Sequence, residues 1–155
     1  MTMPDTALTK ALQRVRENGY VLFQDWPRNV ASASELGLIK EGGAVRLPKD
    51  VRLHDLDSIR KGLPDQLSVQ LYDYIDSTNS AMLRRHEVRR HSQAGAANHL
   101  ILTEFQSAGR GRRGKVWLGD YGRNIAMTLG TELQTNLNAL GGLSSVVGLA
   151  LVQSL

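Results

Sequence analysis

Residues 104–117 read EFQSAGRGRRGKVW and continue an apolar, strand-like run that begins at Leu100. The segment contains three glycines, three arginines and one lysine. Glycine allows positive φ angles and leaves its backbone N–H group uncovered, so a loop of this kind can close around an anion. Arginine adds a planar, permanently charged fork that binds two phosphate oxygens at a time. These features predict a phosphate-binding loop at the end of a strand, followed by Trp117, on whose flat ring a purine can stack.

A second polar motif, Asp76-Ser77-Thr78-Asn79, lies about one helix upstream of this loop. It follows residues 67–75, in which apolar and polar residues alternate as in a strand. Ser77 can cap the helix that follows, because a short side chain with an oxygen atom accepts hydrogen bonds from free helical N–H groups. The two hydroxyls and the amide also supply donors and acceptors for a small polar ring. For Ser77 the capping and binding roles are equally open and compatible, whereas for Asn79 we favour binding.

In this order and spacing the two motifs resemble those of the biotin–protein ligases, and most closely the bacterial bifunctional type that also represses the biotin operon. The resemblance is strong over residues 67–155 and weak before them. It implies an α+β fold, in which a mixed, mainly antiparallel sheet carries helices on one face and is preceded by a partial winged-helix module. Lipoate–protein ligases are a related alternative, but the Gly-Arg-Gly-Arg-Arg-Gly sequence of the loop favours biotin.

Biotin–protein ligases join biotin and ATP into biotinyl-adenylate, release pyrophosphate, and pass the biotinyl group to a lysine of a carrier protein. In the first step a carboxylate attacks the α-phosphate of a polyanion, so positive charge must neutralise and align the two anions. The resemblance therefore implies ATP and biotin as substrates, with Mg²⁺ on the ATP phosphates, although no dedicated metal ligands can be named. The partner it implies is the biotin carboxyl carrier domain of a carboxylase.

The resemblance also assigns the residues that would contact biotin or its adenylate. These are Ser77, Thr78, Asn79, Gln106, Gly109, Arg110, Gly111, Arg112, Arg113 and Trp117. Arg112 is the catalytic candidate, because it would help to retain the reactive intermediate. Two plainer alternatives are a solvated basic loop without a ligand and a Trp117 that is buried in the core. Gly122 and Asn124 match a family turn, and we assign them no ligand contact.

The chain divides by pattern into a partial winged-helix-like module (1–50), a linker (51–66) and the N-terminal part of a catalytic domain (67–155). In the catalytic part we expect a helix from Ser77 to about His91, strands at 100–105 and 124–133, and a buried helix from Leu140 onward. The linker contains a short helix, 53–63. The sequence stops at Leu155 inside an apolar helical pattern and lacks the Lys-Trp-Pro-Asn-Asp-like segment that carries the family's catalytic lysine. We therefore expect a truncated domain that is incomplete and inactive alone.

The module begins with a helix whose apolar residues recur at helical spacing: Leu8, Ala11, Leu12 and Val15. Asn18-Gly19 ends this helix, and strands are expected at 20–23 and 44–47 with irregular chain at 27–43. Arg14 and Arg16 lie on the polar face, where they can touch phosphates. Without a complete helix-turn-helix we expect only weak, sequence-independent DNA binding. A DNA-binding repressor fragment that senses biotinyl-adenylate is the alternative function, and a homodimer is a further candidate assembly.

The composition of the chain narrows the classes of protein to which it can belong. The 155 residues are 41% hydrophobic with a net charge of +4, which suits a globular protein with phosphate-bearing ligands. The absence of cysteine excludes disulfide scaffolds and thiol nucleophiles within the sequence. We see neither a secretory signal at the start nor a run of roughly 20 apolar residues, so we expect a cytoplasmic protein without membrane contact. We expect surface positions for the histidines (His54, His86, His91 and His99) and a solvated helix face at 84–90.

Overall fold

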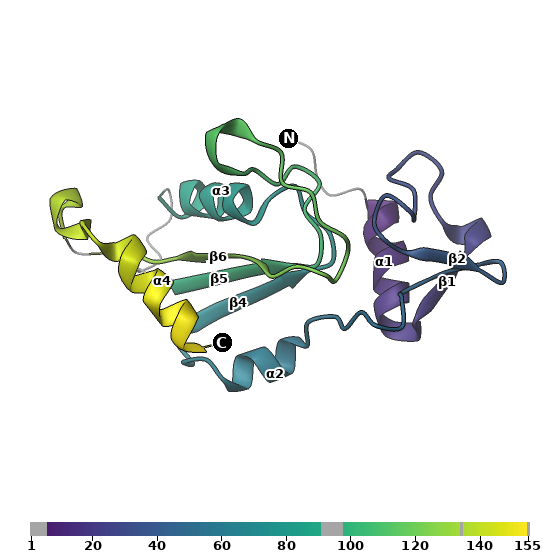
Figure 1. The fold of residues 1–155 in the computed structure, drawn as a ribbon, viewed down its shortest axis with the longest axis horizontal. Coiled ribbons are helices and arrows are strands. Elements are labelled where there is room, and N and C mark those ends of the chain that lie inside the picture. Colours follow the sequence, from purple (N-terminus) through teal and green to yellow (C-terminus); the bar gives the residue numbers. More distant parts are fainter. Residues whose placement is uncertain (1–5, 91–97, 134, 155) are drawn as a thin grey trace.

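The computed structural model describes residues 6–90, 98–133 and 135–154, which form two parts that lie side by side in Figure 1. In chain order the elements are α1 (Thr6–Asn18), β1 (Tyr20–Leu22), the 3₁₀ helix η1 (Phe23–Asp25), β2 (Ile39–Glu41), β3 (Ala44–Arg46), α2 (Leu56–Lys61), β4 (Leu67–Tyr72), α3 (Thr78–Arg90), β5 (Asn98–Thr103), η2 (Arg112–Gly114), β6 (Ala126–Gly130), η3 (Leu137–Leu140) and α4 (Leu143–Ser154). This combination of helices with antiparallel and mixed sheets is the α+β class that the sequence predicts.

The first helix forms as its sequence predicts. Leu8, Leu12 and Val15 are each at most 1% exposed, and they pack in one core with residues of the small antiparallel sheet β1-β3-β2. Gly19 ends the helix in the left-handed conformation, with a φ of 78° that glycine adopts without strain. The apolar stripe and the helix stop are therefore confirmed.

The strand β2 lies within residues 27–43, where the sequence analysis expected irregular chain. All three of its residues are exposed, so no alternation of apolar residues marks it. It pairs with β3 through the backbone, with Lys40 opposite Val45. Gly42 and Gly43 connect the two strands with φ angles of 57° and 74°, as the turn of a two-residue hairpin requires. The Gly-Gly dipeptide was the signal that the prediction overlooked.

The second sheet is mixed, because β4 and β5 run parallel while β5 and β6 run antiparallel. Its register places Gln70, Ile101 and Thr128 side by side in the three strands. Helix α3 covers this face, where Arg85 donates a hydrogen bond to Gln70 and Thr128 donates one to Thr78.

The opposite face of the same sheet packs against α2. Leu100 and Leu102 of β5 form a core with Val69, and Leu56 and Ile59 of α2 pack against it. Helices therefore lie on both faces, so the expectation of helices on one face is wrong. The physical reason is that the segment assigned to the linker contains an amphipathic helix that covers apolar strand residues.

The last elements leave much apolar surface uncovered. Met127 and Leu129 of β6 are 47% and 58% exposed, and no residue of α4 is buried. The prediction of a buried helix here is wrong for residues 143–154, because no other described part of the chain covers them. Among the described residues, no helix combines the length and apolar character needed to cross a membrane.

The two parts of the molecule meet at the carboxyl ends of β4 and β5. In Figure 1 the arrowheads of both strands point toward α1. Tyr74 and Phe105, which follow these strands, stack with ring centroids 5.6 Å apart. Both rings pack against the core of the first part, and the buried Tyr121 is a member of that core. Residues just beyond these strand ends are therefore positioned by both parts.

Candidate functional site

The two polar motifs meet because β4 and β5 stay paired beyond their last residues. Ile75 donates its N–H to the carbonyl of Phe105 at 3.1 Å, and Ser107 donates to the carbonyl of Ile75 at 2.9 Å. Ala108 then donates to the carbonyl of Asp76 at 2.8 Å. These bonds place the start of α3 beside Gln106.

Gln106 makes the direct contact between the motifs. Its side-chain Oε1 accepts the backbone N–H of Thr78 at 2.9 Å and the Thr78 hydroxyl at 3.2 Å. The first N–H groups of a helix have no partner within that helix. Gln106 therefore provides the acceptor that a free N–H group at the start of α3 requires. The contact brings two of the predicted binding residues, Thr78 and Gln106, together.

Ser77 begins the same helix. Its carbonyl accepts the N–H of Ala81 at 2.9 Å, and its hydroxyl oxygen accepts the N–H of Ser80 at 3.4 Å. Ser77 is only 4% exposed, whereas Asn79 on the first turn is exposed. The capping role of Ser77 is confirmed, and its binding role, like that of Asn79, stays a prediction.

The glycine–arginine loop is a narrow hairpin. Trp117 donates its N–H to Gly109 at 3.0 Å, and Gly111 donates to Lys115 at 2.7 Å. The tip, η2, contains Arg113 with a φ of 60°, the left-handed conformation that side chains other than glycine adopt at some cost.

Two of the loop glycines are explained by close packing. A Cβ atom at Gly109 would lie 3.2 Å from the Cβ of Trp117, and one at Gly111 would lie 3.2 Å from the carbonyl oxygen of Lys115. Only Gly114 of the three loop glycines has a positive φ. The expectation that the glycines serve an anion through positive φ is therefore wrong for Gly109 and Gly111, and the N–H of Gly111 is already bonded within the hairpin.

The charged and aromatic residues of the loop differ in their surroundings. Arg110 donates to the hydroxyl of Ser80 at 2.6 Å, which ties the hairpin to α3. Arg113 is exposed at the tip, and Trp117 is 52% exposed. The alternative of a core-buried Trp117 is thus wrong. The side chain of Arg112 lies outside what the structure describes.

A small cavity of about 10 Å³ borders these residues. Gln106 and Trp117 line it together with Asn124, and a space of this size holds about one water molecule. The Asn124 amide donates to the carbonyl of Asp120 at 3.1 Å, which holds the turn before β6. Asn124, for which no ligand contact was predicted, is therefore a neighbour of the predicted site.

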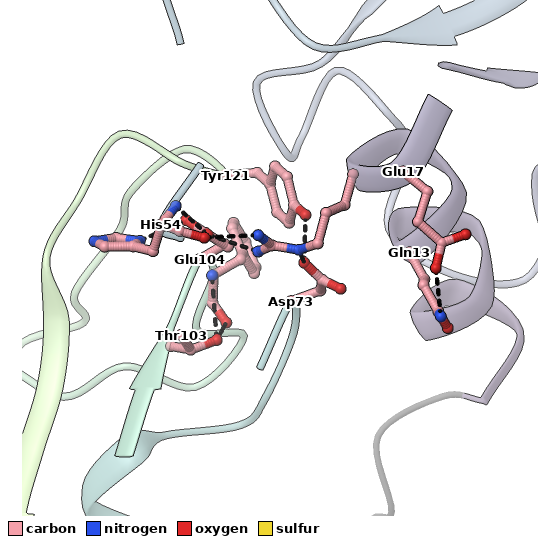
Figure 2. A network of polar contacts seen from close by, with 9 residues as sticks. Gln13, Glu17, His54, Asp73, Thr103, Glu104 and Tyr121 are labelled. Atoms are coloured by element: carbon pink, nitrogen blue, oxygen red, sulfur yellow. Dashed lines mark hydrogen bonds and ion pairs between the residues drawn. The ribbon is translucent and has the colours of Figure 1, made fainter. Parts of the chain in front are cut away.

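A network of charged side chains, of which Glu104 is fully buried and the others are partly exposed, lies at the ends of β4 and β5, as Figure 2 shows. Arg16 of α1 donates to Asp73, which follows β4, and to Glu104, which follows β5, each at 2.7 Å. Tyr121 donates its hydroxyl to Asp73 at 2.7 Å, and His54 contacts the second oxygen of Glu104 at 2.8 Å. The prediction that Arg16 faces solvent and phosphates is therefore wrong, because it bridges the two strand ends that lead into the candidate site.

The network shifts the titration of its members. Burial alone would raise the pKa of Glu104, but hydrogen bonds from His54 and Arg16 outweigh it and lower that pKa. The hydrogen bond to Glu104 raises the pKa of His54 despite partial burial. Burial raises the pKa of Tyr121, and the charge of Asp73 adds to this effect. At neutral pH Glu104 is therefore ionised and Tyr121 is neutral.

The surface positions expected for the histidines hold only in part. His86 is exposed, His54 is half-buried against Glu104, and His99 is buried on β5. His91 lies outside the described residues. In the helix segment 84–90, Arg84 is partly exposed but binds both oxygens of Asp76, at 2.7 and 2.8 Å. Within the described residues, no cluster of three or more histidine, aspartate or glutamate side chains forms a metal site.

A larger cavity, of about 650 Å³, lies at the junction of the two parts. It is bordered by Arg16, His54 and Asp73 of the network and by residues 51–53. Neither this cavity nor the network was predicted from the sequence. A glutamate at the end of the apolar run 100–105 was the available signal, because a charged side chain beside buried strand residues requires a partner.

Comparison with known proteins gives one matching family and three similar relatives. Residues 71–155 match the biotin/lipoate A/B protein ligase family. The chain is 31% identical over 153 residues to the bifunctional ligase/repressor BirA of Salmonella typhimurium and 29% identical over the same length to that of Escherichia coli. It is 25% identical over 150 residues to that of Bacillus subtilis. These alignments cover 97–99% of the chain but only 41% of each relative.

Proposed function

Because the chain belongs to the biotin/lipoate A/B protein ligase family, we propose that it binds biotin as part of an ATP-dependent biotin–protein ligase. In the proposed reaction the biotin carboxylate attacks the α-phosphate of ATP, which arrives with Mg²⁺. The bond between the α- and β-phosphates breaks, and pyrophosphate leaves with that electron pair. A carrier lysine then attacks the acyl carbon of biotinyl-adenylate, and AMP leaves.

The observation that carries this proposal is the contact between Thr78 and Gln106. It joins the two motifs whose order resembles that of the biotin–protein ligases, and it does so beside a hairpin that carries several cations. A carboxamide and two hydroxyls near the start of a helix offer the mixed donors and acceptors that a ureido ring needs.

The hairpin supports the second half of the proposal, the binding of phosphate. Arg110, which binds Ser80 on the first turn of α3, brings fixed positive charge close to the Thr78–Gln106 contact, and Arg113 adds an exposed charge at the tip of the hairpin. We propose that Trp117, which is 52% exposed, stacks on adenine. We propose that Arg112 retains the adenylate, and that Ser77, Asn79, Gly109 and Gly111 complete the site.

The proposed partner is the biotin carboxyl carrier domain of a carboxylase, in the cytoplasm. The relatives are named ligase/repressors, so binding to DNA is a second activity to test. Arg16 does not support it, since its guanidinium is bonded to Asp73 and Glu104. We therefore propose that DNA binding by this module is weak, and a homodimer stays a candidate assembly.

Exchange of labelled pyrophosphate into ATP tests the proposal. The complete gene product that carries this chain should catalyse the exchange when biotin is present, because exchange requires a reversible adenylation step. Exchange that required lipoate or octanoate and did not respond to biotin would show that the substrate is one of these acids and not biotin. No exchange with either acid would remove the ligase assignment.

A further inference from the structure

The 119–124 turn, which connects the glycine–arginine hairpin to β6, is held by the first part of the molecule. Tyr121 in this turn donates its backbone N–H to the carbonyl of Leu36 at 2.9 Å. Its ring is 1% exposed and lies in the same core as Leu36. Its hydroxyl donates to Asp73 at 2.7 Å, as Figure 2 shows. The backbone, the ring and the hydroxyl of Tyr121 therefore anchor the turn through three separate contacts.

Two glycines show how closely this turn is packed. A Cβ atom at Gly37, in the first part, would lie 2.6 Å from both Cβ and Cγ of Asp120. A Cβ at Gly122 would lie 2.7 Å from the side chains of Val51 and Leu53. Because a Cβ moves only with its own backbone, a side chain added at Gly37 would displace the turn.

The same turn borders the candidate site. Its residues Gly119 and Asn124 line the small cavity together with Gln106 and Trp117. Gln106 is held independently of the turn, by its two hydrogen bonds with Thr78. Trp117 lies two residues before the turn and its side chain is 52% exposed, so little else restrains its ring. A displaced turn would therefore move Trp117 and leave Gln106 in place.

We propose that Tyr121 is a positioning residue, through which the first part of the molecule holds the ring of Trp117 in place for adenine. The inference rests on the proposed function, in which Trp117 stacks on adenine, and adds Leu36 and Gly37 as the contacts that fix the turn. It separates the two substrates, because a disturbed contact weakens the use of ATP and spares the use of biotin.

Four variants separate this role from general stability. Gly37→Ala and Tyr121→Leu disturb the contact from its two sides, whereas Tyr121→Phe keeps the buried ring. Gly43→Ala is the matched control for Gly37→Ala, since the two glycines have φ angles of 74° and 73° and alanine meets the same backbone strain at both. A Cβ at Gly43, however, meets no atom within 4 Å.

The test measures biotin-dependent exchange of labelled pyrophosphate into ATP by the complete gene product, with the KM for ATP and the KM for biotin determined separately. Gly37→Ala and Tyr121→Leu should raise the KM for ATP about twofold to tenfold, the range of one aromatic stack, and leave the KM for biotin unchanged. Tyr121→Phe and Gly43→Ala should keep both values. Loss of folded protein alone lowers the rate and changes neither KM.

Each alternative result has a distinct meaning. Wild-type protein without biotin-dependent exchange would overturn the proposed function, and this inference with it. If the wild type is active and Gly37→Ala keeps its KM for ATP, Tyr121 and its contacts have no positioning role, and this variant decides alone should Tyr121→Leu fail to fold. An equal rise of both KM values, or an equal effect of Gly43→Ala, would show a merely structural role and overturn the inference as well.

Discussion

Replacing Arg16 with methionine should destabilise the protein strongly. Methionine keeps an unbranched apolar stem and the helix propensity of α1, but it removes the guanidinium. Arg16 donates hydrogen bonds to Asp73, to Glu104 and to the carbonyl of His54, at 2.7, 2.7 and 2.8 Å. The Asp73 and Glu104 side chains are only 13% and 0% exposed, so the substitution leaves two poorly hydrated carboxylates behind.

The size of the loss in unfolding free energy follows from this geometry. Removing one partner of a buried ion pair costs about 3–5 kcal/mol, because the remaining charge stays desolvated. His54 still donates to Glu104 and Tyr121 still donates to Asp73, so we expect the lower end, about 3 kcal/mol of unfolding free energy.

Arg14→Met on the same helix is the matched control. Arg14 pairs with Asp25 at 3.3 Å, but the two side chains are 57% and 41% exposed, and such surface pairs contribute about 0–1 kcal/mol. Urea unfolding, followed by the fluorescence of the tryptophans, compares the variants, since Trp26 is 7% exposed within the first core. Similar losses for the two variants would refute the role of Arg16 as a link between strand ends.

The hydrogen bond to Glu104 raises the pKa of His54 above its ordinary 6.5, so the stability it contributes is complete below pH 6.5 and lost as pH rises through the folded-state pKa. His54→Gln should abolish this decline in unfolding free energy, and a decline that persists would assign it to another group. Gly109→Ala should lower the free energy of unfolding by about 1–3 kcal/mol, because the added Cβ would crowd Trp117 and Gln106. Gly148→Ala is the control, since a Cβ there meets no atom within 4 Å and should cause no loss. Denaturant unfolding compares the two variants. Arg112→Gly in the complete gene product should release biotinyl-adenylate that labels bystander lysines on a streptavidin blot, with Lys115→Gly as control; unchanged labelling would remove the retaining role.

Local pattern was enough to predict much of the fold. The stripe Leu8–Val15 indicated α1 and the alternation of apolar and polar residues indicated β4, because burial of one face imposes these periods, while a continuous apolar run indicated β5. The order of the two motifs along the chain also indicated that they form one binding site. The exposed strand β2 escaped prediction because its pairing is made by backbone groups, which leave no mark on side-chain polarity.

The parts of the site that escaped prediction depend on contacts between distant residues. Arg16 and Glu104 are 88 residues apart in the sequence, and nothing near either residue identifies the other. The same is true of Thr128 and Thr78, which meet only when β6 pairs with β5 under α3. The hairpin was overlooked for another reason, since a run of glycine and arginine resembles a solvated loop until its backbone bonds are known.

The central claim is that Thr78 and Gln106 form a biotin site, and nuclear magnetic resonance of the ¹⁵N-labelled complete gene product that carries this chain tests it most directly. We predict that biotin shifts the Thr78 backbone amide and both side-chain N–H signals of Gln106, while lipoate leaves them in place. The side-chain amide of Asn98, which pairs with Thr131 away from the site, serves as the internal control. Signals of Thr78 and Gln106 that stay unchanged at saturating biotin, or that move equally with lipoate, would contradict the account.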